Sequence, residues 1–420
     1  MDVFKKPVPR LLNKAHHNID VSKISDGANF VIRTLKSSGY DAFLVGGCVR
    51  DLILQNDPND FDVVTNAKPN EIIKIFGRQS RPIGKRFKLV HVRSKNEVTE
   101  VSTFRRMPRR IKSDKNFRKR LKGDNEFGSI SEDVFRRDFT INALYFDIDQ
   151  KVVIDYVGGF YDLTDRKISC IGNPFERFEE DPMRILRAIR FATTLKLSMK
   201  NISLTEFSRC GGLLSNLSAA RLFYELEKMF LRGSAAVLFN ELVGLNLIHF
   251  LFPILDRNNM EDPVYKRALD TIKIALQITD ERVKMGQSAN LAFLCAVILW
   301  SALKIEIQNL RCQITDESLI FNIAAENIIS NQIKTIAIPR RVSNIMREIW
   351  KIQSVFENPT RRDANRLLQN RRLRAGYNFF VLRSKTEDYL TDTVDWWRKF
   401  FAVARKMNKL PFPESQTYRL

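Results

Sequence analysis

The sequence has few of the residues that build disulfide frameworks and zinc sites. Its five cysteines stand singly, with no C-x-x-C pair, and it contains four histidines. We therefore expect neither a disulfide framework nor a structural zinc site. Long hydrophobic runs are also missing: the longest, Leu291 to Leu303, is shorter than the roughly 20 residues that cross a bilayer, so it predicts a buried helix. The N-terminal MDVFKKPVPR has no apolar core of signal-peptide length, and we expect a cytoplasmic protein without a membrane partner.

The chain has fewer acidic than basic residues. The chain has 48 Asp and Glu against 69 Lys and Arg, a formal net charge of +21. This excess is larger than solubility requires and has the sign that attracts nucleic acid, although a membrane surface would attract it too. The 420 residues suffice for about three domains, and no internal repeat or low-complexity tract is evident.

The stretch FLVGGCVRDLILQNDPNDFDVVTN, residues 43–66, carries the most chemical information. The apolar run from Phe43 to Val45 predicts a buried strand, Gly46 and Gly47 a sharp turn with exposed backbone N–H groups, and Val49 to Leu54 the helix that follows. Such a turn before a helix can hold phosphates, and Arg50 would point at the anion.

Two aspartates follow this turn with one residue between them. On a strand of period two, Asp60 and Asp62 lie on one face while Phe61 is buried on the other. Carboxylate oxygens on one face suit Mg²⁺, and two such ions would support phosphoryl transfer. The alternative is that D-x-D is only polar loop sequence, which the glycine turn upstream disfavours.

Two further stretches add polar groups downstream. Glu100, in a strand-like run from Glu97 to Thr103, is a candidate third carboxylate, acting as metal ligand or as base toward a primer hydroxyl; Glu97 or a solvent-facing role are the alternatives. Farther on, Arg137 can meet a triphosphate, while Asp138 and Asn142 offer an acceptor and a donor to ribose hydroxyls. An ordinary helix start with charged residues is the competing interpretation.

The sequence Glu180-Asp181-Pro182-Met183-Arg184 begins a predicted helix with proline in its first turn. Asp181, Arg184 and Arg187 then lie close together on adjacent turns, where they could select a base through its Watson–Crick edge. The competing interpretation is an acidic N-terminal cap with an i,i+3 ion pair.

The order of the elements predicts an α+β protein. Strand-like runs occur up to about Tyr156 and vanish beyond about Pro182, after which helical periodicity dominates. This order favours a catalytic head with a mixed sheet followed by an all-α remainder. The predicted strands are Phe43 to Val45, Phe61 to Val64, Lys88 to Val92, Glu97 to Thr103, Leu144 to Asp147 and Val152 to Asp155.

Together these stretches resemble the class II template-independent RNA nucleotidyltransferases, which comprise the CCA-adding enzymes and the bacterial poly(A) polymerases. The resemblance runs from about Ile24 to Ser234 and rests on five motifs: Gly46-Gly47-x-x-Arg50-Asp51, Asp60-x-Asp62, Arg136-Arg137-Asp138-x-x-x-Asn142, Asp155-x-x-Gly158-Gly159-x-x-Asp162 and Glu180-Asp181-x-x-Arg184.

The resemblance implies a polymerase-β-like nucleotidyltransferase head in which Asp60 and Asp62 hold two Mg²⁺ ions. It also implies all-α neck, body and tail domains, with the base-selecting motif in the neck, RNA held by the body and tail, and Gly158 and Gly159 as a hinge. We place the head at residues 22–156, the neck at 157–235, the body at 236–330 and a basic C-terminal RNA-binding region at 331–420.

Within this class the sequence favours a poly(A) polymerase that adds AMP from ATP to RNA 3′ ends. The stretch Ile83 to Val92 and the segments from Ile338 to Trp350 and from Arg374 to Arg383 resemble the poly(A) polymerases, although Val90 stands where a smaller residue is expected. The alternatives are a CCA-adding tRNA nucleotidyltransferase and, in another class, an inactive RNA-binding adaptor. Retention of both Asp60 and Asp62 disfavours the adaptor.

A run of ten basic residues and a single acid lies between Arg105 and Lys122. It predicts a mobile loop over the active site that neutralises phosphates of the RNA 3′ end, and a solvated face is the alternative. The chosen RNA-binding residues are Arg109, Arg110, Arg118, Lys119 and Arg120. A second candidate stripe comprises Arg361, Arg362, Arg366, Arg371, Arg372 and Arg374; the interleaved Tyr377 is expected in the core.

Overall fold

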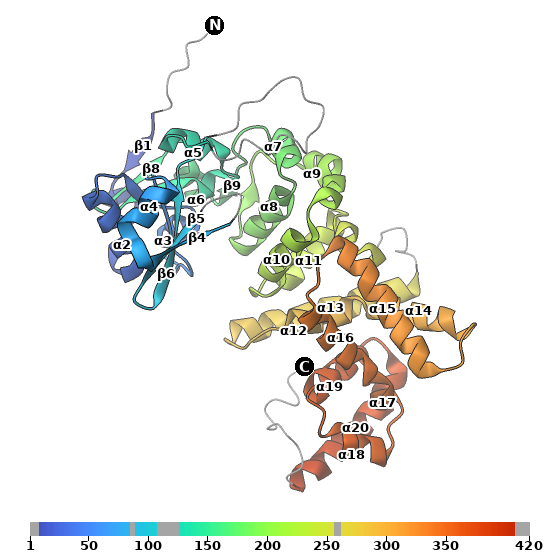
Figure 1. Cartoon of the computed structure of the whole chain (residues 1–420). Coiled ribbons are helices and arrows are strands. Elements are labelled where there is room, and N and C mark those ends of the chain that lie inside the picture. The colour runs from blue at the N-terminus through green and yellow to red at the C-terminus, as the bar shows by residue number, and fades with distance from the viewer. Residues whose placement is uncertain (1–7, 85–88, 107–125, 256–261, 408–420) are drawn as a thin grey trace. The chain divides into compact units, whose positions relative to one another are not determined.

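The computed structural model describes residues 8–84, 89–106, 126–255 and 262–407. The chain divides into two compact units, residues 1–184 with 195–206, and residues 185–194 with 207–420. All strands of the described residues lie in the first unit, and helices make up the second (Figure 1). The expected α+β class is therefore confirmed, whereas the division into four domains stays a prediction.

An eight-stranded sheet forms the centre of the first unit, in the order β1-β8-β7-β2-β3-β6-β5-β4. Its neighbouring strands pair antiparallel except β3 and β6, which pair in parallel. A second sheet pairs β9 with β10. The strands are β1 Arg10–Leu12, β2 Ala42–Val45, β3 Asp62–Thr65, β4 Ser80–Ile83, β5 Leu89–Ser94, β6 Glu97–Thr103, β7 Leu144–Asp147, β8 Val152–Asp155, β9 Lys167–Ile168 and β10 Ser198–Met199.

Four of the helices that accompany these strands, α1, α2, α5 and α7, begin at a polar side chain that caps the helix. In α2, the Ser25 side chain accepts from the Ala28 N–H, and the buried Ala28, Val31, Ile32 and Leu35 recur at helical spacing. The helices up to residue 210 are α1 Lys14–His17, α2 Asp26–Ser37, α3 Gly47–Ile53, α4 Pro69–Phe76, α5 Ile130–Arg136, α6 Gly159–Thr164, α7 Pro174–Glu180, α8 Met183–Thr194 and α9 Leu204–Cys210. Short 3₁₀ helices include η4, Thr140–Asn142.

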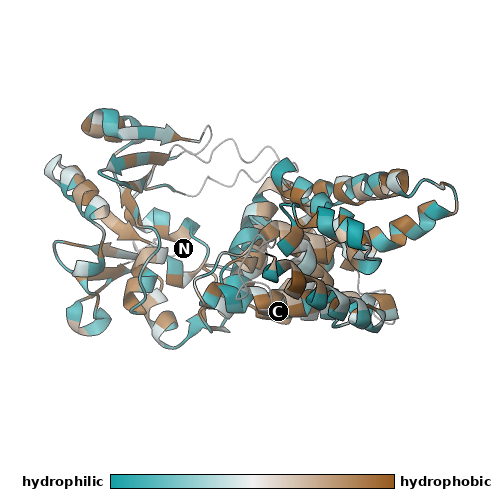
Figure 2. Cartoon of the chain, turned by 90° about the horizontal axis from the view of Figure 1, so that it is seen from below, coloured by the Kyte–Doolittle hydropathy of each residue, from teal (hydrophilic) through white to brown (hydrophobic). Residues whose placement is uncertain are grey.

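The helices of the second unit pack around large aromatic side chains. The indole N–H of Trp350 donates to Ala296 O at 2.9 Å, and that of Trp397 to Phe356 O at 2.9 Å. Most helices carry both hydrophilic and hydrophobic residues, as Figure 2 shows. The α-helices beyond residue 210 are α10 Ala219–Phe230, α11 Ala235–Gly244, α12 Pro263–Lys284, α13 Leu291–Ile298, α14 Trp300–Arg311, α15 Glu317–Thr335, α16 Arg340–Lys351, α17 Gln353–Glu357, α18 Arg361–Leu367, α19 Leu373–Arg383 and α20 Thr391–Lys406.

The run from Leu291 to Leu303 forms α13 and the first turn of α14, and α13 is buried, as predicted. Among the described residues no single helix is long and apolar enough to cross a membrane, and α13 with α14, bent by 48°, meets the criteria of length and composition only as a pair.

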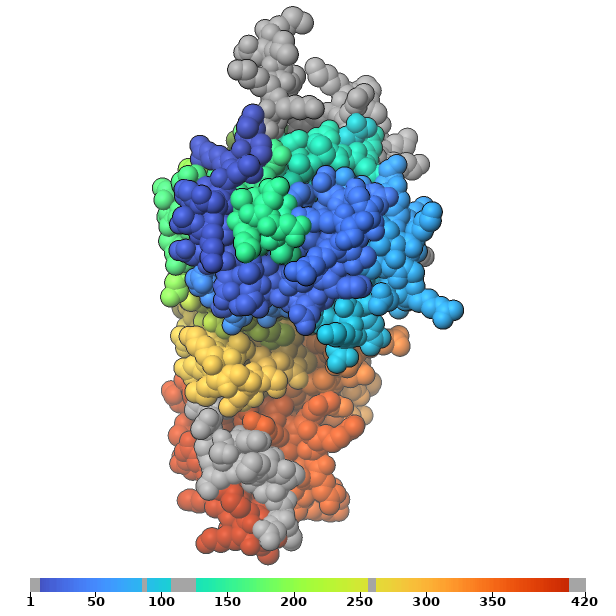
Figure 3. All heavy atoms as spheres, turned by 90° about the vertical axis from the view of Figure 1, so that its left-hand side faces the viewer, coloured from blue at the N-terminus to red at the C-terminus, as the bar shows by residue number. Residues whose placement is uncertain are grey.

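Four strands, β1, β4, β9 and β10, were not predicted. Strands β1 and β4 are edge strands, and the prediction that strands vanish beyond Pro182 is wrong, because β10 pairs with β9. A strand as short as β9 or β10 shows no readable period of two. The Arg10 guanidinium of β1 lies 5.2 Å from the Tyr161 ring centroid of α6. Figure 3 shows a face on which the N-terminal part of the chain (dark blue) lies beside a later segment of the same unit (green).

Candidate active site

The carboxylates expected to bind metal lie at one end of two paired strands. Asp62 is the first residue of β3 and the register partner of Glu100 on the parallel strand β6. Register partners on neighbouring strands face the same side of a sheet, so these two carboxylates share a face. Asp60 and Asp62 are both exposed. The prediction of a strand that includes Phe61 is wrong: β3 begins only at Asp62, so Asp60 lies in the loop before it, and Phe61 is half-buried.

The two glutamates considered as a third carboxylate have different contacts. Glu97 accepts from the Gly27 N–H at 2.8 Å, at the start of α2, and so stabilises a helix end. Glu100 lies opposite His91 of β5, with 3.7 Å between Nε2 and Oε2, and both side chains are partly exposed. Glu100, and not Glu97, is therefore aligned with Asp62. His91 is a neighbour that could bind the Glu100 carboxylate in place of a metal ion.

The glycine turn joins β2 to α3. Gly46 has φ 78° and ψ −125°, a conformation that residues with a side chain avoid, and it precedes Gly47, where α3 begins. The expectation of exposed N–H groups is wrong for Gly46, which donates to Leu144 O at 3.1 Å. The buried Cys48 thiol lies 3.4 Å from Val45 O and 4.0 Å from Asp62 O, so α3 packs against the start of β3. Burial raises the pKa of Cys48 to about 12, which keeps the thiol neutral.

Arg50 extends from α3 to the segment that carries the predicted ribose-binding residues. Its guanidinium donates to Asn142 Oδ1 at 2.8 Å and to both carboxylate oxygens of Asp51. Asn142 in turn donates to Asp138 Oδ1 at 3.2 Å. Arg50 and Asn142 are buried and Asp138 is half-buried. A single chain of hydrogen bonds thus links the glycine turn's helix to η4.

Arg137 is held beside the same turn by a buried pair of residues. Its Nε donates to Tyr145 Oη at 3.0 Å and to Asp133 Oδ2 at 3.1 Å, and Nη2 donates to Asp133 Oδ2 at 3.0 Å. Its Nη1 lies 3.5 Å from the point where a Gly46 Cβ would be. Burial alone would lower the pKa of Arg137, but Tyr145 and Asp133 raise it above its ordinary value, so the residue is charged.

Asp133 was not among the predicted site residues. It is 4% exposed, accepts from the Tyr145 hydroxyl at 2.8 Å, and accepts from the Arg105 N–H at 3.2 Å. The i,i+4 spacing of Asp133 and Arg137 on one helix was the available signal, but in a sequence it resembles any surface ion pair.

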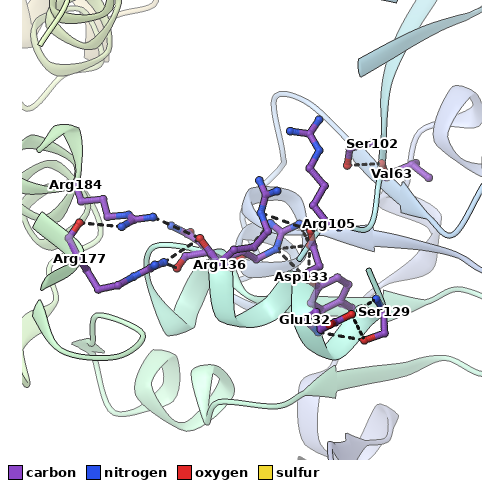
Figure 4. Close-up of polar contacts among 12 residues, drawn as sticks. Val63, Ser102, Arg105, Ser129, Glu132, Asp133, Arg136, Arg177 and Arg184 are labelled. Carbon is purple, nitrogen blue, oxygen red and sulfur yellow. Dashed lines mark hydrogen bonds and ion pairs between the residues drawn. The ribbon is translucent and has the colours of Figure 1, made fainter. Parts of the chain in front are cut away.

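The residues predicted to select the base lie around the break between α7 and α8. Asp181 Oδ1 accepts from the Met183 N–H at 3.3 Å, which caps α8. Arg184 donates to Arg177 O at 2.8 Å (Figure 4). It also donates to Glu180 Oε2 at 3.2 Å. The competing interpretation, an acidic cap beside an ion pair, therefore describes these contacts well, although the pair spans i,i+4. Arg187 belongs to the second unit, with its guanidinium 5.2 Å from the Phe191 ring centroid.

The five chosen residues of the basic loop, Arg109, Arg110, Arg118, Lys119 and Arg120, lie outside the described residues. The residues at either end of this segment are described. Arg105 and Phe127 form an antiparallel bridge, and Arg106 Nε lies 2.6 Å from Glu126 Oε2. In the second candidate stripe, Arg361, Arg362, Arg366 and Arg371 are exposed, and Tyr377 is buried as expected.

Gly158 and Gly159, which the sequence predicts to form a hinge, lie where the structure requires glycine. Gly158 has φ 79°, and a Cβ on Gly159 would lie 2.1 Å from Thr140 O. The buried Asp155 carboxylate accepts from four successive N–H groups, those of residues 157–160. These contacts fix the segment in one conformation, so the hinge stays a prediction.

Metal binding rests on few protein ligands. In the part of the chain that the structure describes, no group of three or more His, Cys, Asp or Glu side chains is arranged to hold a metal ion. Magnesium often uses only one or two carboxylates and completes its shell with water and substrate phosphates. Exposed carboxylates at Asp60 and Asp62 fit that mode of binding.

The chain is similar to three family models. Residues 42–169 match the poly A polymerase head domain, residues 203–258 the model described as probable RNA and SrmB-binding site of polymerase A, and residues 316–417 the polymerase A arginine-rich C-terminus.

Relatives of two kinds match the sequence. Poly(A) polymerase I of Salmonella typhi is 36% identical over 413 residues, which cover 95% of this chain and 87% of that protein. The CCA-adding enzyme of Bacillus cytotoxicus is 37% identical over 202 residues, 48% of this chain and 49% of that protein. Among solved structures, the Bacillus stearothermophilus CCA-adding enzyme in complex with CTP has a TM-score of 0.56 and 25% identity, covering 90% of this chain and 82% of that one.

Proposed function

Because this chain belongs to the poly(A) polymerase family, we propose that it extends RNA 3′ ends with AMP from ATP, without a template. The 3′ hydroxyl oxygen attacks the α-phosphorus of ATP, a new phosphodiester bond forms, and pyrophosphate leaves. The geometric support is one observation: hydrogen bonds join Arg50, Asn142 and Asp138 beside the Gly46 turn, and Cys48 packs that turn's helix against the start of β3.

We assign the carboxylates of Asp60 and Asp62 to Mg²⁺, with Glu100 as the third carboxylate. Bound there, two Mg²⁺ ions would lower the pKa of the attacking hydroxyl and neutralise the leaving pyrophosphate. The protein's own contribution is to hold Asp62 and Glu100 in register on two paired strands, so that the backbone at both residues is already in place when substrate binds.

We assign the triphosphate to Gly46, Gly47, Arg50 and Arg137, and the ribose to Asp138 and Asn142. Arg50 and Arg137 are held by Asp51 and Asp133, so their guanidinium groups are oriented before the anion arrives. A triphosphate would form charge-assisted hydrogen bonds with these guanidinium groups, and the low dielectric around the buried Arg50 and the half-buried Arg137 would strengthen them.

Asp181, Arg184 and Arg187 are assigned to selection of the base. Selection of this kind rests on fixed donors and acceptors, since a wrong base leaves them unpaired. Asp181 caps α8 and Arg184 bonds Glu180, so ATP would have to share or replace these contacts.

The decisive experiment supplies a generic RNA and Mg²⁺ with each nucleoside triphosphate separately and measures product length. We expect long products with ATP alone. Asp60→Asn and Asp62→Asn should each reduce turnover by several orders of magnitude while RNA affinity stays close to that of the wild type. Activity within tenfold of the wild type in both variants would contradict the metal assignment.

CCA addition is the alternative. In sequence, the CCA-adding enzyme of Bacillus cytotoxicus matches only about half of the chain, against 95% for the poly(A) polymerase of Salmonella typhi. A CCA-adding enzyme would need CTP first and would stop after completing a tRNA end. Products that stop in this way would replace the first proposal with the second.

We propose that the basic loop, through Arg109, Arg110, Arg118, Lys119 and Arg120, contacts the phosphates of the RNA 3′ end. Neutralising all five should weaken RNA binding and reduce the slope of log affinity against log salt by about 0.7 per lost contact on single strands. The control neutralises the exposed Lys74 and Arg78, which lie outside both candidate basic stretches. An unchanged slope in the loop variant would assign the loop to a solvated face.

A further inference from the structure

Arg177 is a buried cation for which the proposed reaction has no assigned use. It lies on α7, is 4% exposed, and is held among backbone carbonyls and one carboxylate. Burial, and then the charge of Arg184, lower its pKa, while Glu180 opposes this shift. Its Nε is buried with no hydrogen-bond partner among the described residues. Burying a cation with one donor unsatisfied is unfavourable, so an arginine here needs a compensating role.

The remaining Arg177 donors reach two separate parts of the candidate site. Nη2 donates to Arg136 O at 2.9 Å and to Arg137 O at 2.6 Å, and Nη1 donates to Glu180 Oε2 at 2.5 Å. The two carbonyls end helix α5, where the helix dipole favours a positive charge. Arg177 therefore holds the backbone of Arg137, while Asp133 holds the Arg137 guanidinium.

Arg184 contacts Arg177 and the groups that Arg177 binds. It donates to the Arg177 carbonyl and places Nη2 3.5 Å from Arg136 O (Figure 4). It also shares Glu180 Oε2 with Arg177. Three residues of the α7–α8 break and the end of α5 thus form one polar cluster within the first unit. A displacement of Arg177 would move both the residue assigned to the triphosphate and one assigned to the base.

Given the function proposed above, we propose that Arg177 is a positioning residue that couples base selection by Arg184 to triphosphate binding by Arg137. A lysine at this position keeps the charge but has a single nitrogen, which cannot hold two carbonyls and Glu180 in the same fixed plane. If Arg177 served only to cap α5, its loss would lower stability and leave nucleotide choice unchanged.

The first test needs no activity. Hydrogen–deuterium exchange is compared in the wild type, Arg177→Lys and a control, Arg190→Lys, which alters an arginine of α8 bonded to the buried Glu225 at 2.6 Å. In Arg177→Lys, exchange should become faster both in residues 134–142 and in residues 181–186. In Arg190→Lys, residues 134–142 should exchange as in the wild type. Unchanged exchange of either segment in Arg177→Lys would overturn the proposal.

The second test measures kcat and KM with ATP and with CTP for Arg177→Lys, Arg184→Lys and the double variant. Each single variant should lower the ratio of ATP to CTP use by roughly 10- to 100-fold. The double variant should lose less than the product of the two, because both act through one cluster. A normal ratio in Arg177→Lys, or effects that multiply, would overturn the coupling. A wild type that fails to add AMP while the exchange result holds would instead contradict the proposed function.

Discussion

Two buried arginine networks with similar chemistry occur in different units of the protein. In the first unit, Arg137 bonds a carboxylate four residues earlier, Asp133, and the hydroxyl of Tyr145. In the second, Arg383 bonds a carboxylate four residues later, Glu387, and its Nη2 lies 3.5 Å from the hydroxyl of Tyr389. Both networks place a guanidinium, a carboxylate and a phenol within hydrogen-bond distance, yet their surroundings differ.

Arg383 and Arg137 differ in the exposed fraction of their side chains and in the groups that surround them. The Arg383 side chain is 0% exposed; it also pairs with Glu357 at 2.6 Å and lies 4.5 Å from the Trp300 ring centroid. The Arg137 side chain is 22% exposed, and Gly46 leaves space beside it. An arginine enclosed by carboxylates and rings cannot reach an anionic ligand, whereas one partly open beside a glycine turn can bind an anion. Arginine networks therefore indicate anion binding only together with their access to solvent.

The largest effect is expected from Arg383→Met. Removing the cation deprives Glu357 of its ion pair with Arg383 and leaves Glu387 with Lys304 and Tyr389 alone. The loss of one member of a buried ion pair costs about 3 to 5 kcal/mol. Urea unfolding should show a decrease of that size in the free energy of unfolding, while the control Arg366→Met, whose side chain is 67% exposed, should change little. A loss below about 1 kcal/mol in Arg383→Met would show that the network stabilises nothing beyond the packing around it.

Asp133→Asn tests the other network. It keeps the shape of the side chain but weakens its bonds to Arg137 and Tyr145, so kcat/KM for ATP should fall on the order of 10- to 100-fold, as expected for a lost charged hydrogen bond. The control Glu132→Gln removes a neighbouring exposed carboxylate of α5 that bonds the Ser129 N–H. Equal losses of kcat/KM in the two variants would contradict a specific role for Asp133.

The smallest effect is a dependence of stability on pH. Burial alone would raise the pKa of Glu387, but hydrogen bonding to Arg383 and the charge of Arg383 lower it from 4.5 to about 2. The unfolded chain therefore binds a proton at higher pH than the folded one, so the stability from this group is fully present above pH 4.5 and is lost as the pH falls toward 2.

The measurement is the free energy of unfolding at several pH values below neutrality, for the wild type and Glu387→Gln. The variant should show a flatter decline between about pH 4.5 and pH 3. Glu317→Gln is the exposed control: Arg311 lowers the pKa of Glu317 too, but solvent screens that pair. Parallel curves for Glu387→Gln and the wild type would show that the Arg383 network does not depend on the charge of Glu387.

Short runs of apolar or β-branched residues were predicted best. Strands β6, β7 and β8 have the predicted bounds: β7 and β8 are apolar runs that end at an aspartate, and β6 is rich in valine and threonine. Strands β1 and β4 lie at the two edges of the sheet, and their residues carry no such pattern. Helix α3 begins two residues earlier than Val49, because a glycine in the first turn is weak sequence evidence for a helix.

The sequence by itself determined the fold class, the family and the residues worth testing, because period, glycine turns and motif order are local properties of a chain. The tertiary structure alone decided which of these residues meet. It aligned Glu100 rather than Glu97 with Asp62, since register depends on strand pairing across distant segments. It also revealed Asp133 and Arg177, since their importance comes from buried contacts with Arg137 that no spacing in the sequence specifies.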